Sequence, residues 1–320
     1  GEEVSRRAFL RSAAAAAIAA PLIPSAMAAP TPKDAPETLV TQLYKSLKDK
    51  QREAVCFEFD HALRSKVDAN WHITEPQIDK LLDKDQQDLV KQIFMGLHSE
   101  EYAETVYGQV MHDSGKKGFG SSSIALFGEP GTGKFEFVLT GRHCTRRCDG
   151  DSVKGAAFGG PIFYGHAADS FNEQADHKNN AYWYQGIRAN KVFQALDGKQ
   201  QKLALLDKAR RESGTSTVKL TGKKSGLPGI PLSELSKDQK QLVNKTLADL
   251  LAPFRKADSD EVMKLVKKNG MDNLHMAFFK QGDIGNDRVW DVWQIEGPAM
   301  VWYFRGAPHV HTWAHIRDSA

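Results

Sequence analysis

The sequence predicts an α+β fold with an internal duplication, in which each half packs helices on an antiparallel β-sheet. Apolar residues recur first at helical spacing and then at strand spacing, and this order appears twice. The offset between matching segments stays at about 150 residues. One such match between amphipathic helices could arise by chance, but several in the same order indicate a duplication. We therefore expect a first half over 37–180 and a second half over 190–320.

The first half begins with helical patterns. One helix is expected from about Glu37, and a second from about Asp83, where Gln86 three residues later has the spacing of a capping box. A third helix is expected from about Ser99. Alternating apolar residues then predict strands, which run over 124–127, 135–140 and 155–164.

The second half repeats these patterns. Leu82–Val90 is echoed by Leu235–Val243, in which Ser236 and Gln239 again have the spacing of a capping box. A helix over Asp260–Lys268 corresponds to the third helix of the first half. The strands expected after it run over 274–279, 289–295 and 300–304.

The first residues have the features of a twin-arginine (Tat) signal peptide. Ser5–Arg11 contains two adjacent arginines, Ala13–Ile23 is apolar, and Ala26–Ala28 has the small-x-small form of a cleavage site. We predict a signal peptide over 1–28 and a Pro-rich linker over 29–36. The mature protein would then be periplasmic or secreted, with the twin-arginine translocase as a partner during export and no membrane attachment after cleavage.

Composition restricts the partners. The 320 residues include 43 basic and 40 acidic side chains, with a net charge of +3 and no basic run interleaved with aromatics. Nucleic acid is therefore not an expected partner. A small-molecule or anionic substrate is compatible with this charge.

The three cysteines leave their redox state open. Cys144 and Cys148 flank a short segment that is expected to be a turn, so they could form a short-loop disulfide or remain thiols. Cys56 lies in an apolar run and is expected to be buried. Zinc binding by these cysteines would need two further ligands at matching spacing, which the sequence lacks.

The segment Gly128–Lys134 matches the spacing of a phosphate-binding loop, G-x-x-x-x-G-K. That site needs Ser or Thr after the lysine and a helix behind it, but Phe135 follows and the next residues alternate as in a strand. The corresponding segment of the second half, Gln281–Arg288, also joins two strands. We therefore expect a β-hairpin turn and no nucleotide site.

Histidines at the C-terminus predict a metal site. His309 and His311 follow a strand, and residues i and i+2 of a strand point to the same side. Imidazole suits zinc, copper or iron, and His143 at a strand end of the first half is the best third ligand. Two readings stay open beside it: imidazoles bonded to backbone carbonyls, and binding of an organic ligand. Weaker candidates for the same pocket are His72, His166 and His315.

The arginines near His143 suggest that the protein could bind an anionic substrate. Arg142, Arg146 and Arg147 could hold such a molecule, or could form a solvated basic turn. No general acid or base can be selected from the sequence. Motifs such as G-x-S-x-G and H-E-x-x-H are missing, which excludes the commonest hydrolase classes.

Several motifs together resemble one family. The Trp71-His72 connection, Phe127–Pro130, Gly141–His143 and His309–Trp313 are similar to the exported bacterial domain-of-unknown-function family 3500. The resemblance covers about residues 38 to 318. Members of that family often have two adjacent histidines where this chain has Arg142-His143, so only His143 is carried over. The resemblance implies one fold and a site at the histidines, and it implies no particular reaction.

The leading functional hypothesis is a metal-dependent enzyme, hydrolytic by a slight margin, with His143, His309 and His311 as ligands of a transition metal ion. One alternative is a non-catalytic exported protein that binds a metal or a small ligand. Another is a redox metalloenzyme. The sequence does not identify the substrate, the metal or the oligomeric state.

Overall fold

The computed structural model describes residues 35–167, 180–285 and 287–320. The expected signal peptide over 1–28 and nearly all of the expected linker lie outside the described residues. Among the described residues, no helix is both long enough and apolar enough to span a membrane.

Helices and strands alternate in blocks along the chain. The helices are α2 (Pro36–Ser46), α3 (Asp49–Val55), α4 (Ile78–Leu81), α5 (Lys84–Gly96), α6 (Ala103–Ser114), α7 (Trp183–Gln194), α8 (Gly198–Ala204), α9 (Lys237–Leu251) and α10 (Lys256–Asn269). The strands are β1 (Cys56–Phe57), β2 (Ser123–Gly128), β3 (Phe135–Gly141), β4 (Cys144–Cys148), β5 (Ile162–His166), β6 (Leu205–Leu206), β7 (Ile230–Pro231), β8 (His275–Phe279), β9 (Val292–Gly297), β10 (Met300–Arg305) and β11 (Val310–Ile316).

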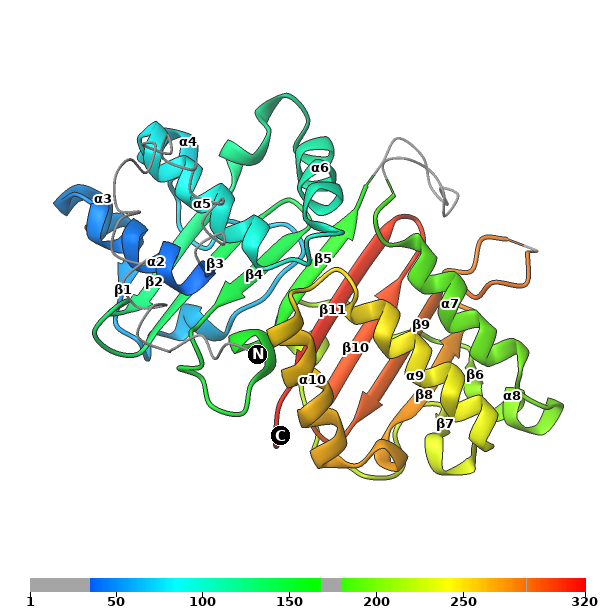
Figure 1. The fold of residues 1–320 in the computed structure, drawn as a ribbon. Coiled ribbons are helices and arrows are strands. Elements are labelled where there is room, and N and C mark those ends of the chain that lie inside the picture. Colours follow the sequence, from blue (N-terminus) through cyan, green and yellow to red (C-terminus); the bar gives the residue numbers. More distant parts are fainter. Residues whose placement is uncertain (1–34, 168–179, 286) are drawn as a thin grey trace, which may run out of the picture. The chain divides into compact units, whose positions relative to one another are not determined.

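All of these strands belong to one 11-stranded sheet (Figure 1). Its order is β1-β2-β3-β4-β5-β11-β10-β9-β8-β6, with β7 also paired to β8. The last strand of the chain, β11, pairs antiparallel with β5 in the middle of the sheet, with His311 opposite Gly165. The N-terminal and C-terminal strands therefore share one continuous sheet.

The sheet is mixed, which corrects the expectation of an antiparallel sheet in each half. β1 pairs parallel with β2, and β6 pairs parallel with β8. Parallel neighbours need a long crossover connection, and helices supply it in both places. Between β1 and β2 the chain passes through α4, α5 and α6, and between β6 and β8 it passes through α9 and α10.

The two faces of the sheet have different covers. Helices lie over one face, called here the helix-covered face (Figure 1), and bury a large apolar core that includes Leu126, Phe137 and Trp302. Irregular segments pack on the opposite face, called here the loop-covered face. Val67, Ala69 and Val218 of these segments contact strand residues such as Tyr303 and Trp313.

Several local expectations are confirmed. Asp83 with Gln86 and Ser236 with Gln239 form the expected capping boxes at the starts of α5 and α9. Gly128–Lys134 is the turn of the β2–β3 hairpin, in which the Glu129 amide donates to the Lys134 carbonyl at 2.9 Å. The phosphate-loop spacing is therefore a coincidence of turn residues.

The expected turn between Cys144 and Cys148 is wrong, because these residues form strand β4. Residues i and i+4 of a strand are about 13 Å apart, whereas a disulfide needs Cα atoms about 4.4–6.8 Å apart. Both cysteines are accordingly free and buried. The strand expected over 155–164 is also displaced, since β5 starts only at Ile162.

Candidate metal centre

The structure brings His143, His309 and His311 together on the loop-covered face. His311 lies near the start of β11, His309 directly precedes that strand, and His143 lies in the turn between β3 and β4. One nitrogen of each imidazole lies within 4.8 Å of the others, so the group could hold a metal ion. His143 and His311 are buried, whereas His309 is partly exposed and leaves the group accessible from solvent.

Two carboxylates set the orientation of the two buried rings. Nδ1 of His143 lies 2.9 Å from Oδ2 of Asp113, and Nδ1 of His311 lies 2.7 Å from Oε2 of Glu212. A carboxylate accepts hydrogen bonds, so each Nδ1 carries a proton, which leaves the lone pair on Nε2 when the ring is neutral. This is the arrangement by which proteins orient metal-binding histidines.

The Nε2 atoms face one another. Nε2 of His143 is buried and has no hydrogen-bond partner among the described residues. Nε2 of His309 lies 2.9 Å from Nε2 of His311. Two lone pairs at this distance repel unless a proton or a cation lies between them, and ligands of one ion are typically about 3 Å apart.

Burial keeps the imidazoles of His309 and His311 uncharged. It is the main cause that lowers the pKa of His309 to about 3, with further lowering by His311, His143 and Arg305. Burial also lowers the pKa of His311 to about 4, although Glu212 opposes this shift. Burial raises the pKa of Glu212, but the hydrogen bond from His311 and the nearby charges outweigh it and hold that pKa below its usual range. Neutral imidazole is the form that binds a metal ion.

Backbone features place the His143 ring. His143 has a left-handed conformation (φ 53°), and its amide donates to Oδ1 of Asn70 at 3.0 Å. Gly165 on β5 lies opposite His311, and a Cβ there would come 3.3 Å from Cδ2 of His143 and 2.4 Å from the Val310 carbonyl oxygen. The glycine therefore lets the turn histidine reach across β5 toward β11.

The weaker histidine candidates do not join the group. Nε2 of His72 bonds to the Ser121 carbonyl at 2.8 Å, and Nδ1 of His315 bonds to the Val218 carbonyl at 3.1 Å. These two have the backbone-bonded form considered as an alternative for the C-terminal pair. His166 lies nearer, with Nδ1 4.0 Å from Oδ1 of Asp113.

Two of the three arginines considered for binding an anionic substrate are instead buried in the protein. Arg146 and Arg147 are each 3% exposed. Arg146 donates to the Phe163 carbonyl on the helix-covered face, and Arg147 pairs with Glu136 at 2.9 Å on the loop-covered face. Their alternation follows from β4 being a strand. Arg142 is exposed.

Sequence reasoning did not find Asp113, Glu212, Asn70 or Gly165. Asp113 is buried near the end of α6, and Glu212 lies in an irregular segment. A helix-spaced aspartate or a single loop glutamate has no pattern that distinguishes it from a surface residue. Only the pairing of segments far apart in the chain reveals their role.

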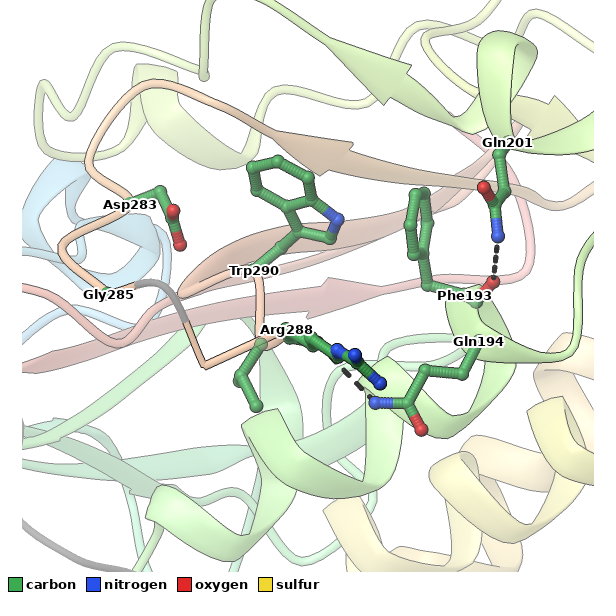
Figure 2. Close-up of a pocket in the computed structure, with 8 residues that line it drawn as sticks. Phe193, Gln194, Gln201, Asp283, Gly285, Arg288 and Trp290 are labelled. Atoms are coloured by element: carbon green, nitrogen blue, oxygen red, sulfur yellow. Dashed lines mark hydrogen bonds between the residues drawn. The ribbon is translucent and has the colours of Figure 1, made fainter. Parts of the chain in front are cut away.

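A cleft of about 630 Å³ lies elsewhere in the molecule (Figure 2). Trp290 and Phe193 line it with ring centroids 5.9 Å apart, beside Arg288 and Gln194. The side chain of Gln201 bonds to the Phe193 carbonyl at 3.3 Å. His143, His309 and His311 do not line this cleft, so it is separate from the histidine group.

The fold and the histidine group together define a mixed α/β protein with a candidate three-histidine metal centre. The chain belongs to the family described as Protein of unknown function (DUF3500), whose model matches residues 31–319. No curated protein and no solved structure matches the chain.

Proposed function

We propose that the chain is a metal-dependent enzyme, hydrolytic in its leading form, with His143, His309 and His311 as the ligands. The observation that carries this proposal is the convergence of three imidazoles, two of which have their Nδ1 protons held by buried or half-buried carboxylates. A group that served only packing would have no need of a buried imidazole nitrogen without a partner, such as Nε2 of His143, directed at two further imidazoles.

Three imidazoles fit zinc, copper or iron. Such an ion would supply Lewis-acid chemistry, and a zinc ion would lower the pKa of a bound water to about 7. Asp113 and Glu212 would hold the imidazole rings in the ligating tautomer throughout. The partly exposed side of the group at His309 would admit water and substrate.

Metal analysis of the protein purified without a histidine tag tests the proposal. We expect about one transition metal ion per chain, and its loss in His309→Ala/His311→Ala. His315→Ala is the matched control, because His315 lies on the same strand and bonds to the Val218 carbonyl. The metal centre is rejected if neither the wild type nor the His315→Ala control carries metal after incubation with zinc, copper or iron.

The identity of the metal separates the proposed enzyme from its alternatives. Zinc with an exchangeable water favours hydrolysis, and copper or iron favours a redox metalloenzyme. An ion whose coordination is complete without water favours the non-catalytic binding protein.

We also propose that the protein is exported by the twin-arginine route to the periplasm or beyond. Ser5–Arg11 with the apolar segment behind it supports this. Replacing both arginines, as Arg6→Lys/Arg7→Lys, should leave the protein in the cytoplasmic fraction. Unchanged export of this variant would refute the route.

We further propose that the fold arose by duplication. The order of elements around the central β5–β11 pair supports it, because β1 to β5 on one side correspond in order to β6, β8, β9, β10 and β11 on the other. Both series begin with a parallel pair at the edge. Solved structures of the family superposed half on half would test this correspondence.

A further inference from the structure

A small cleft on the loop-covered face lies next to the histidine group. Its volume is about 260 Å³, and its lining includes Arg210, Arg211, Glu212, Val292, Tyr303 and Arg305.

The cleft and the histidine group share a wall. Arg305 on β10 is the register partner of His311 on β11, and directly opposed side chains have Cβ atoms about 5 Å apart. Glu212 touches both residues: its Oε2 accepts from His311 at 2.7 Å, and its Oε1 lies 3.1 Å from Nη1 of Arg305. A group seated at Arg305 would therefore lie beside any ion held by the histidines.

The charges of the cleft leave positive groups available. Arg210 is satisfied, because it donates to Glu296, Gln294 and the Thr217 carbonyl. Arg305 is only partly satisfied: its Nε is buried and has no hydrogen-bond partner among the described residues. Arg211 is exposed at the rim and adds a second positive charge.

The side chain of Arg305 lines the cleft and is 24% exposed, and its guanidinium has donors beyond the one that faces Glu212, from which an oxyanion could accept. Guanidinium groups match carboxylate and phosphate oxygens in geometry as well as charge. The cleft is smaller than the roughly 300–1,000 Å³ of pockets for whole small molecules. It therefore suits one charged group of a larger substrate.

We infer that this cleft binds the oxyanion group, carboxylate or phosphate, of a substrate whose reacting part reaches the histidine centre. Arg305 and Arg211 supply the positive charge, and Val292 and Tyr303 also line the cleft. This inference rests on the proposed metal-dependent function and assigns its substrate a negative charge at one end.

Calorimetric titration of the zinc-loaded full chain with inorganic phosphate and, separately, with acetate tests the inference. We expect one of the two anions to bind, and Arg305→Met to weaken its binding about tenfold or more, as removal of a charge-assisted hydrogen bond does. Arg211→Gln should weaken binding by a smaller factor. Lys208→Gln removes a nearby positive charge that does not line the cleft and should leave binding unchanged.

Wild-type protein that binds neither anion would overturn the inference, and so would equal binding by wild type, Arg305→Met and Arg211→Gln. The zinc content of every sample is measured in parallel, because Arg305→Met also removes a partner of Glu212. Arg211→Gln removes none of the hydrogen bonds or ion pairs of Glu212 with His311 and Arg305, and gives the answer if Arg305→Met fails to fold. Loss of the arginine dependence with zinc retained rejects the cleft alone, whereas failure of wild type to hold zinc or another metal rejects the proposed function.

Discussion

The two faces of the sheet bury different kinds of side chain. The helix-covered face is mostly apolar, with Ile124, Leu126 and Phe137 fully buried beneath the helices. The loop-covered face contains charged and titratable groups, among them the pair Arg147–Glu136 and the histidine group. Apolar burial on the helix-covered face therefore stabilises the fold, with Arg146 as a buried exception, whereas the loop-covered face holds an ion pair and imidazoles whose polar groups have partners in other segments.

The largest expected effect is on the loop-covered face. Glu136→Ala leaves the fully buried Arg147 guanidinium without its carboxylate and should lower the free energy of unfolding by about 3–5 kcal/mol. Urea denaturation measures this loss. The double variant Glu136→Leu/Arg147→Met replaces the pair with apolar groups of similar size and should be much less destabilised. A double variant as unstable as Glu136→Ala would show that the pair itself stabilises the fold.

The second prediction concerns the carboxylate behind His143. Asp113→Asn should weaken zinc binding about 10–100-fold, because an amide can hold the ring in the wrong tautomer. Competition with a chelator of known affinity measures this change. Asp79→Asn, a substitution in a surface ion pair, is the control and should have wild-type affinity. Equal affinities of the two variants would remove Asp113 from the centre.

A smaller effect is expected from an apolar change on the helix-covered face. Ile124→Val removes one buried methylene group and should lower the free energy of unfolding by about 0.5–1.5 kcal/mol. Thermal and urea unfolding measure the loss, and zinc titration of the same variant should give the wild-type affinity. A changed zinc affinity would mean that the two faces are energetically coupled.

The smallest effect is a pH dependence within the helical layer. Burial, followed by the charges of Asp149, Asp151 and Asp258, raises the pKa of Glu261 on α10 to about 7. An acid with a raised pKa in the folded state binds its proton more tightly there, so stability falls as pH rises from about 5 to 7. The free energy of unfolding of Glu261→Gln, measured relative to wild type, should therefore be higher at pH 8 than at pH 5. Urea midpoints at both values measure the gain, and a pH-independent difference would contradict it.

The sequence was sufficient where local chemistry decides the structure. Capping residues located α5 and α9, alternation located β3 and β10, and the i, i+2 spacing put His309 and His311 on one side of β11. These signals depend on neighbouring residues alone.

The sequence was insufficient where long-range pairing decides. β4 contains two arginines, so its sequence indicates a turn, because the groups that bind its buried arginines come from other segments. The edge strands β1 and β6, which form the parallel pairs, have only two residues each and are too short for any periodicity. Asp113 and Glu212 meet His143 and His311 only after helix and loop segments dock on the sheet.

About half of the chain lies between His143 and His309, and the β5–β11 pairing brings the two together. An ion bound by both would act as a removable crosslink across this long loop. Since it would bind the folded chain alone, an ion concentration 100 times its dissociation constant would add about 2.7 kcal/mol to the free energy of unfolding. The metal supply of its surroundings would then set how long the protein resists proteolysis.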